Sequence, residues 1–180
     1  MLNIILISVA LIVVGFLIVV ALQPATFQIT RTATISAPPA RVFSQVNDFH
    51  NWPDWSPWAK LDPAMKQTYD GTASGTGAIY SWTGNKQVGE GRMTILDSRP
   101  NEVVKIRLEF LKPFKATSIA EFTFSPQNGN TLVAWSMLGD KNFMFKAVHL
   151  LMNMDKMVGR DFEKGLAQMK QVVEAGQVSA

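Results

Sequence analysis

The chain has 180 residues, 17 Lys+Arg against 14 Asp+Glu and a net charge of +3, and 47% of its residues are hydrophobic. This apolar content, which includes 11 Phe and 5 Trp, excludes an intrinsically disordered chain, and the absence of Cys excludes disulfide frameworks, iron–sulfur clusters, cysteine-ligated zinc and thiol nucleophiles. The chain has no run of Lys or Arg of the kind that tracks phosphates, so we expect no nucleic-acid partner.

An uncharged segment opens the chain, because every charged residue follows Thr30. Residues 4–22 are apolar except for two, and at about 1.5 Å per residue a helix over this range is roughly 28 Å long, close to the hydrocarbon thickness of a bilayer. The segment therefore predicts a transmembrane helix. A cleaved secretory signal is the alternative, with Val19 and Ala21 at a small-residue cleavage site, but a signal needs a basic region that this segment lacks.

The predicted organisation is a transmembrane anchor at residues 1–22, a linker at 23–26, one soluble domain at 27–176 and a tail at 177–180. We expect a single-pass membrane protein. Arg31, Arg41 and Lys60 follow the apolar segment and no basic residue precedes it, which under the positive-inside rule favours a cytoplasmic domain while leaving the side open.

A half-buried strand is predicted over residues 27–35, where apolar and polar residues alternate. Arg31 falls on the apolar side of this alternation, which predicts a bulge or a nearby lipid phosphate. Pro38 and Pro39 then introduce a short helix, because proline is favoured in the first turn, and an aromatic, Pro-rich loop follows over residues 50–58.

Six further strands are predicted from alternating segments bounded by turn signals. They cover residues 65–69, 77–83, 87–96, 103–110, 117–124 and 131–138. No helical segment separates them, so they must pair in antiparallel fashion. Their alternation places residues such as Val104, Ile106 and Leu108 on a covered face of the sheet, and Lys105 and Arg107 on a solvated one.

A long amphipathic helix is predicted over residues 154–174, where apolar residues recur at intervals of three and four. Gly159 and Gly165 interrupt this helix, and each lowers its stability by about 1 kcal/mol relative to Ala. Glycines at this cost predict that another group approaches the helix closely, and they favour a hollow beside it. Five of the 9 Met lie between Met144 and Met169. Flexible thioethers suit a surface that repacks around varied apolar ligands, and ordinary gap filling is the alternative.

The order of these elements, together with three short motifs, resembles a known superfamily. The motifs are ISAPPARVF at residues 35–43, the Trp-rich loop at 52–58 and DFEKGL at 161–166. They are similar to the polyketide cyclase/dehydrase branch of the START-like, helix-grip superfamily often called SRPBCC. The resemblance implies an α+β fold in which a seven-stranded antiparallel sheet wraps around a long C-terminal helix and encloses a deep apolar cavity for lipids, polyketides, quinones or similar molecules. The superfamily mixes binding proteins, transfer proteins and a minority of enzymes, so it does not assign a reaction.

We predict that the cavity lies between the covered face of the sheet and the C-terminal helix. Its predicted ligand-binding residues are Tyr80, Trp82, Met93, Ile106, Leu108, Phe122, Trp135, Met137, Met154, Val158 and Phe162. The predicted rim or lid consists of Trp55, Trp58, Phe143 and Met144. A solid core is the alternative, because a sheet and a helix must bury apolar side chains in any case, and Trp52 and Trp55 would then plug the fold.

The sequence offers few catalytic or metal-binding candidates. His50 and His149 are far apart, no carboxylate stands at a fixed offset to orient either of them, and no cluster of potential metal ligands occurs. Glu90 and Arg92 share the predicted solvated face of their strand. We therefore expect no metal and no cofactor, and we assign no catalytic residue.

These observations leave three hypotheses for function. The first is a membrane-tethered binding module that holds a hydrophobic small molecule or lipid in the cavity, with that ligand and the membrane as its partners. The alternative is a polyketide cyclase/dehydratase-like enzyme that uses the same cavity, in which Tyr80, Glu90 or His149 would move a proton. The third is a structural or regulatory subunit that contacts another membrane protein through the apolar ridge at residues 143–151, a ridge that could instead dip into the membrane interface or gate ligand passage.

Overall fold

The computed structural model describes residues 1–176, so the predicted tail at 177–180 lies outside the described residues. The helices are α1 (Leu2–Ala21), α2 (Pro39–Asn47), the 3-10 turn η1 (Phe49–Asn51), α3 (Trp52–Trp55), α4 (Phe143–Leu151) and α5 (Met154–Ala175). The strands are β1 (Thr26–Ile35), β2 (Lys66–Gly71), β3 (Ala78–Thr83), β4 (Glu90–Arg99), β5 (Val103–Lys112), β6 (Ala116–Gln127) and β7 (Asn130–Asp140).

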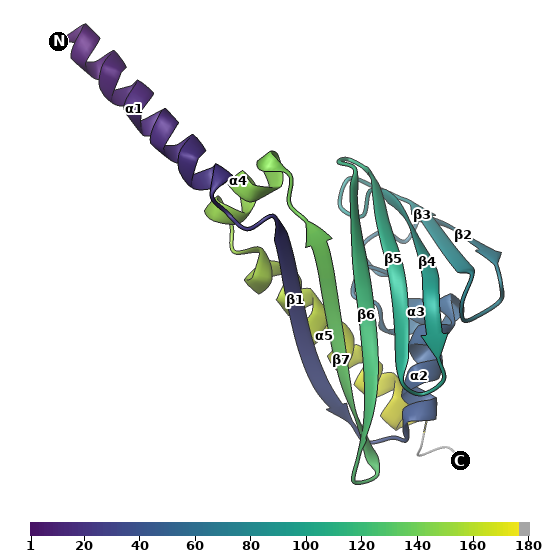
Figure 1. Cartoon of the computed structure of the whole chain (residues 1–180). Helices are drawn as coiled ribbons and strands as arrows, with labels where there is room; N and C mark the ends of the chain where they lie inside the picture. Colours follow the sequence, from purple (N-terminus) through teal and green to yellow (C-terminus); the bar gives the residue numbers. More distant parts are fainter. Residues whose placement is uncertain (177–180) are drawn as a thin grey trace.

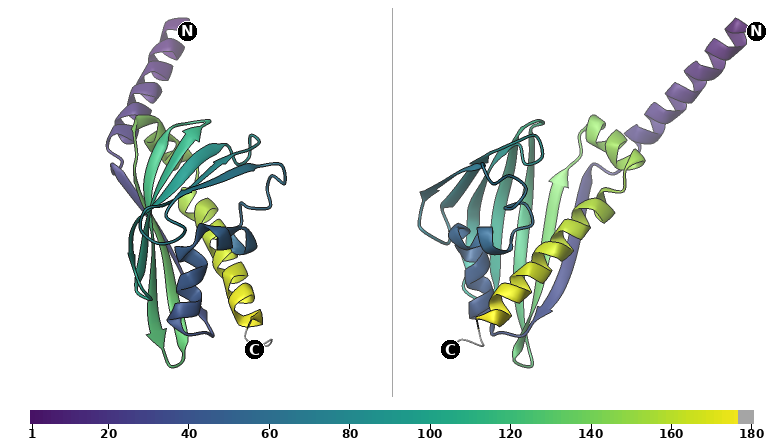
Figure 2. Two further views of the ribbon diagram at one scale, coloured as in Figure 1. Left: turned by 90° about the vertical axis from the view of Figure 1, so that its right-hand side faces the viewer. Right: turned by 180° about the vertical axis from the view of Figure 1, so that it is seen from behind.

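The strands form one antiparallel sheet of seven, in the order β1-β7-β6-β5-β4-β3-β2, with β1 and β2 at its edges (Figure 1). Helices α2, α3 and α5 lie on the same side of the sheet, which curves around them (Figure 2). This is the predicted α+β helix-grip fold. The main difference in strand bounds is that β4 begins at Glu90 rather than 87, because residues 84–89 form a turn in which the Gly84 and Gly89 amides donate to nearby carbonyls.

The two faces of the sheet differ in polarity, as alternation in the strands predicts. On the outer face, Lys105 Nζ lies 3.1 Å from Glu121 Oε2 on the neighbouring strand. The inner face carries the core, in which side chains from β4 to β7 meet those of α2, α3 and α5. The largest fully buried side chains of this core include Trp55, Phe49, Phe122, Phe162, Ile106 and Leu166.

Arg31 attaches α5 to the edge strand β1. Its guanidinium donates to Asp155 at 3.0 Å and to Glu163 at 2.7 Å, and it also donates to the Asp155 backbone carbonyl. The guanidinium occupies the space where a Cβ on Gly159 would stand. Arg31 therefore lies on the covered side of its strand because α5 offers it two carboxylates, so the expected bulge or lipid phosphate is not needed. The register of β1 with β7 is continuous through this position.

Gly165 is the second close approach on α5. A Cβ at this position would lie 2.9 Å from Trp135 and 3.1 Å from Pro57, so the glycine lets the helix sit directly on an aromatic ring of the sheet. The prediction of a close approach is thus confirmed for Gly159 and Gly165, and the groups that approach are side chains of the protein itself. Side chains of Arg31, Trp135 and Pro57 fill both gaps.

The apolar segment forms α1, which projects away from the domain (Figure 1). Within the described residues it is the one helix long and apolar enough to cross a membrane. From Asn3 to Ala21 its side chains are exposed except that of Val20, which is fully buried at the base of the helix. Lys146 of α4 donates to the Ala21 carbonyl at 3.2 Å, so α4 packs against the end of α1.

The predicted C-terminal helix is preceded by a separate short helix, α4. Asn142 caps α4 by accepting from the Phe145 amide at 2.9 Å, and Asn153 caps α5 by accepting from the Lys156 amide at 2.9 Å. Each asparagine satisfies an amide that the first turn of a helix leaves unpaired. The two caps explain why the chain turns between Leu151 and Met154 instead of continuing as one helix.

Candidate functional site

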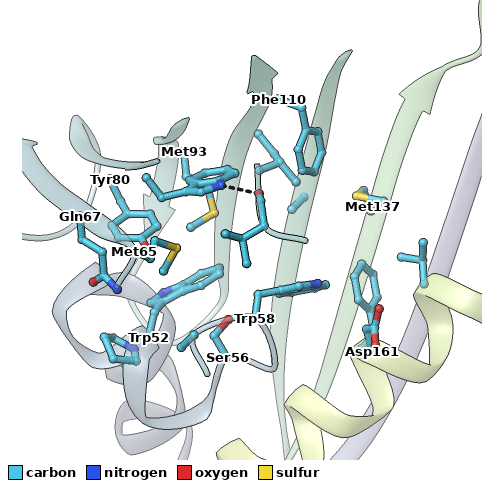
Figure 3. Close-up of a pocket in the computed structure, with 18 of the residues that line it drawn as sticks. Trp52, Ser56, Trp58, Met65, Gln67, Tyr80, Met93, Phe110, Met137 and Asp161 are labelled. Atoms are coloured by element: carbon cyan, nitrogen blue, oxygen red, sulfur yellow. Dashed lines mark hydrogen bonds between the residues drawn. The ribbon is translucent and has the colours of Figure 1, made fainter. Parts of the chain in front are cut away.

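A cavity of about 260 Å³ lies between the inner face of the sheet, the start of α5 and the loop after α3. Figure 3 shows its labelled side chains converging from strands, loop and helix. Its walls are mainly aromatic and aliphatic: Trp52, Pro53, Ser56, Trp58, Ala59, Met65, Gln67, Tyr80, Trp82, Gln87, Val88, Met93, Leu108, Phe110, Ala120, Trp135, Met137, Val158, Asp161 and Phe162. We call this space the main pocket.

The Trp-rich loop forms one wall of the main pocket. Asp48 starts the loop by accepting from the His50 amide at 2.9 Å. The indole of Trp52 donates to the Val46 carbonyl at 3.1 Å and that of Trp55 donates to Gln45 at 3.0 Å, so both rings are anchored on α2. These hydrogen bonds keep buried indole N–H groups from being left unpaired, which would cost about 1–3 kcal/mol each.

Trp82 forms the opposite wall because Gly91 has no side chain. A Cβ at Gly91 would overlap the Trp82 ring, so the indole lies flat over the backbone of β4. Its N–H donates to the Val88 carbonyl at 3.0 Å, which fixes the ring. The turn before β4 and the glycine at its start therefore position an aromatic wall rather than a catalytic group.

Trp135 differs from these three tryptophans in its hydrogen bonding. It is stacked between Phe122, at 4.7 Å between ring centroids, and Phe162, at 4.0 Å. It lines the main pocket and is 3% exposed, and among the described residues its Nε1 is the one buried side-chain nitrogen or oxygen without a hydrogen-bond partner. The main pocket is thus an apolar space, and one residue that lines it holds a buried N–H donor without a partner.

Few titratable groups border the main pocket. Burial, with a smaller contribution from Tyr69, raises the pKa of Tyr80 to about 12, so its hydroxyl stays protonated at neutral pH. Asp161 lies at the α5 side of the pocket (Figure 3). A phenol with a pKa this high donates hydrogen bonds but is a poor proton acceptor near pH 7.

A second pocket of about 260 Å³ adjoins the main pocket and shares Phe110, Met137 and Val158 with it. Its other lining residues come from β1, β5, the β5–β6 turn, β6, β7, α4 and α5: Phe27, Ile29, Lys112, Pro113, Phe114, Ala116, Thr117, Ser118, Asp140, Phe145, His149 and Met154. His149 packs on Phe27 with 5.4 Å between ring centroids. Burial, and then the charge of Lys141, lowers the pKa of His149, which favours the neutral imidazole.

The structure brings most of the predicted cavity residues together. The main pocket is lined by eight of them, namely Tyr80, Trp82, Met93, Leu108, Trp135, Met137, Val158 and Phe162. Met154 lines the second pocket instead. Ile106 and Phe122 line neither and are fully buried, because α2 packs over this part of β5 and β6 and the indoles of Trp52 and Trp55 contact the Phe122 ring.

The predicted rim residues divide in the same way. Trp58 lines the main pocket, whereas Trp55 is fully buried in the core and is not at a rim. Phe143 and Met144 lie on α4, are 47% and 71% exposed, and line neither pocket. Trp52, which we considered as a plug, lines the main pocket while its indole is anchored on α2.

The three residues considered for proton transfer are not brought together. Tyr80 borders the main pocket, His149 borders the second, and Glu90 borders neither and forms an ion pair with Lys112 at 2.6 Å. Within residues 1–176, no group of three or more His, Asp or Glu residues is placed to hold a metal ion. The arrangement therefore offers binding surface and isolated hydrogen-bond donors rather than an assembled acid–base pair.

Several lining residues were missed by sequence reasoning. Phe110 shares the strand parity of Leu108, so alternation in β5 was a usable signal for it. Ser56 lies in the Trp-rich loop that was predicted at the rim, but its polar side chain was not singled out. Met65 was predicted as the first residue of a strand, which begins at Lys66 instead, and no sequence pattern indicated that Ala59 lines the pocket.

The fold has close counterparts among solved structures. A protein from Mesorhizobium loti, MLL2253, is 14% identical, with a TM-score of 0.61 over 83% of this chain and 98% of its own. The Aha1 protein from Colwellia psychrerythraea, solved as a dimer, is 14% identical, with a TM-score of 0.60 over 83% of this chain and 98% of its own. A protein from Chromobacterium violaceum, CV1439, is 16% identical, with a TM-score of 0.57 over 84% of this chain and 99% of its own. Likeness at this level of identity shows the fold alone.

No functionally curated protein matches the chain. The family described as "Polyketide cyclase / dehydrase and lipid transport" matches residues 26–174, which is the whole sheet and nearly all of α5. The antiparallel sheet wrapped around α5 agrees with the START-like, helix-grip fold that the sequence motifs indicate. The chain therefore belongs to the polyketide cyclase/dehydrase and lipid transport family, within the SRPBCC superfamily.

Proposed function

We propose that this protein is a membrane-tethered binding module that holds a hydrophobic small molecule or lipid between its sheet and α5. The observation that carries the proposal is the main pocket, an apolar space of about 260 Å³ that shares three lining residues with a second pocket of about the same volume. Burial of the apolar surface of such a ligand, at about 25 cal/mol per Å², would supply the affinity before the costs of association.

The unpaired Trp135 N–H refines the chemical class of the ligand. A buried donor without a partner is costly, and after a small movement of the ring that brings the buried Nε1 to the pocket surface, an acceptor atom on the ligand would relieve that cost. We therefore propose a ligand that is mainly hydrocarbon and carries a carbonyl, carboxyl or ether oxygen. A plain alkane would fill the same space and leave Trp135 unpaired.

The tether is the second part of the proposal. In α1 a run of exposed apolar side chains extends from Ile4 to Val19 with no charged residue among them. Such a surface is stable in a bilayer rather than in water, and a 19-residue span has the length that the hydrocarbon core requires. The linker between α1 and β1 is short, so the main pocket would stay near the membrane surface.

Tryptophan quenching in nanodiscs tests the binding function on the full-length chain. Four of the 5 Trp line the main pocket, so a fatty acid that carries a bromine atom should quench the fluorescence strongly and with saturation. The variant Ala120→Leu, which narrows the pocket, should bind the fatty acid more weakly. Quenching that rises linearly with concentration and is equal in the two proteins would overturn the proposal.

An enzyme of the cyclase/dehydratase kind is the alternative, and Tyr80 is the observation that favours it. Its protonated hydroxyl borders the main pocket and could hydrogen-bond a substrate carbonyl. The variant Tyr80→Phe separates the two functions, because a binding protein would lose about tenfold in affinity at most, whereas an enzyme that relies on this hydroxyl would lose turnover of a polyketide-like substrate by about a hundredfold or more.

A further inference from the structure

One end of the domain carries an exposed apolar surface on two segments. The first segment is α4 with the residue after it, where none of the nine helical residues is buried. The exposed apolar side chains here are Phe143, Met144, Val148, Leu150, Leu151 and Met152. The second segment is the β5–β6 turn, where Phe114 is 76% exposed. Together we call them the α4 surface.

The α4 surface lies at the end of the domain from which α1 departs. In Figure 1, α4 sits at the base of α1 and the β5–β6 turn lies at the same end of the sheet, whereas the β6–β7 turn lies at the opposite end. Lys146 of α4 donates to the carbonyl of Ala21, the last residue of α1. A bilayer that contains α1 would therefore begin beside α4.

The α4 surface and the residues that flank it carry a net positive charge. Residues 111–116 and 138–152 contain four Lys and one acidic residue, Asp140, which gives a net charge of +3. Lys112 pairs with Glu90, but among the described residues neither Lys115 nor Lys141 forms an ion pair. An apolar ridge bordered by lysines matches a membrane surface with anionic headgroups, because the lysines attract the headgroups while the apolar side chains enter the acyl boundary.

The second pocket opens at this surface. Phe114 from the turn and Phe145 and His149 from α4 line it from two sides, and it meets the main pocket at Met137 and Val158. An apolar molecule that leaves the bilayer between α4 and the β5–β6 turn would thus remain in contact with apolar side chains as far as the main pocket.

We propose that the α4 surface docks on the anionic surface of the bilayer that holds α1, so that the second pocket opens toward the lipid. This inference rests on the proposed tether and goes beyond it, because a tether alone does not require that the domain touch the membrane surface. The partner is the phospholipid surface itself. A partner protein on the same surface is the competing outcome of the test below.

Depth-dependent quenching on single-cysteine variants tests the docking. The chain has no native Cys, so Leu151→Cys and Phe114→Cys can each carry one environment-sensitive fluorophore in the full-length protein. Val13→Cys reports on α1, and Ser125→Cys, on β6 near the β6–β7 turn, serves as the control at the far end. Each protein is reconstituted in nanodiscs of phosphatidylcholine alone, or mixed with an equal share of phosphatidylglycerol. The lipids carry a spin label at a shallow position for the probes at 151, 114 and 125, and at a deep acyl position for the probe at Val13.

We expect the probes at positions 151 and 114 to be quenched, more strongly with phosphatidylglycerol, while the probe at Ser125 is not. Replacing Lys115 and Lys141 by Gln should lower the ratio of docked to undocked molecules by about fivefold per lysine, whereas Lys60→Gln should not. If the probe at Val13 is not quenched, the tether itself is wrong. If it is quenched while positions 151 and 114 behave like 125, the tether stands and the docking is overturned. The docking is also overturned if a photocrosslinker at position 151, used in cell membranes, captures a protein in place of lipid.

Discussion

The variant Ala120→Leu distinguishes a hollow interior from a packed one. Ala120 is 5% exposed, lines the main pocket, and pairs with Ile106 and Met137 on the neighbouring strands. Leucine adds three carbon atoms, which at about 0.8 kcal/mol each would contribute roughly 2.4 kcal/mol if they fill empty space. Ordering the longer side chain costs about 0.5–1 kcal/mol, so we expect a net gain of about 1.5 kcal/mol in the free energy of unfolding of the ligand-free protein.

Urea unfolding of the full-length chain, followed by tryptophan fluorescence, measures this gain. The matched control is Ala78→Leu, because Ala78 is 2% exposed in the core and lines neither pocket. Added methylenes there must displace neighbours, which typically costs about 1–3 kcal/mol. The two variants should therefore shift the midpoint in opposite directions. A loss of stability in Ala120→Leu as large as that in Ala78→Leu would refute the existence of usable space in the main pocket.

Three further variants test other parts of the account. Trp135→Phe removes the unpaired N–H. It should weaken binding of a long-chain ketone by about fivefold to tenfold in a quenching titration and leave binding of an alkane of equal length unchanged. Equal losses of affinity for the two ligands would contradict the proposed acceptor atom. Gly159→Ala should stabilise α5 by about 1 kcal/mol in an Arg31→Met background, but by less in the native chain, because the new Cβ displaces the Arg31 guanidinium from its two carboxylates. Equal effects on the urea midpoint in the two backgrounds would show that the ion pairs of Arg31 contribute little to stability. The pKa of His149 is lowered in the folded chain, so the stability that His149 contributes is complete above its unfolded pKa of about 6.5 and is lost as the pH falls through its folded pKa. His149→Gln should remove this part of the dependence of stability on pH. An unchanged dependence would be evidence against the role of His149.

The fold was predictable because its signals are local and repeated. Alternation in seven strands and spacing of three and four in α5 were sufficient to assign faces, and antiparallel pairing followed from the lack of helices between the strands. Arg31 was the exception, because its position depends on Asp155 and Glu163, which lie more than a hundred residues further along the chain. No local pattern indicates a partner at that separation.

The site was predictable only where strands build it. Tyr80, Met93 and Leu108 were predicted as pocket residues from the alternation of side chains along their strands. The same alternation selected Ile106, which is on the same face as Leu108 but belongs to the packed core. Parity assigns a side chain to the inner face but does not tell where α2 covers that face and where α5 leaves it open. The glycines on α5 were an ambiguous signal for a similar reason, because a missing Cβ indicates a close neighbour without indicating whether that neighbour is a ligand or the protein itself.

The most direct test of the central claim is native mass spectrometry of the full-length chain purified from membranes and released from nanodiscs. The account predicts a population heavier than the chain by a small apolar molecule, which organic solvent extracts and an added fatty acid displaces, and it predicts that Ala120→Leu carries less of it. A single mass equal to that of the bare chain, unchanged after incubation with the fatty acid, would contradict it.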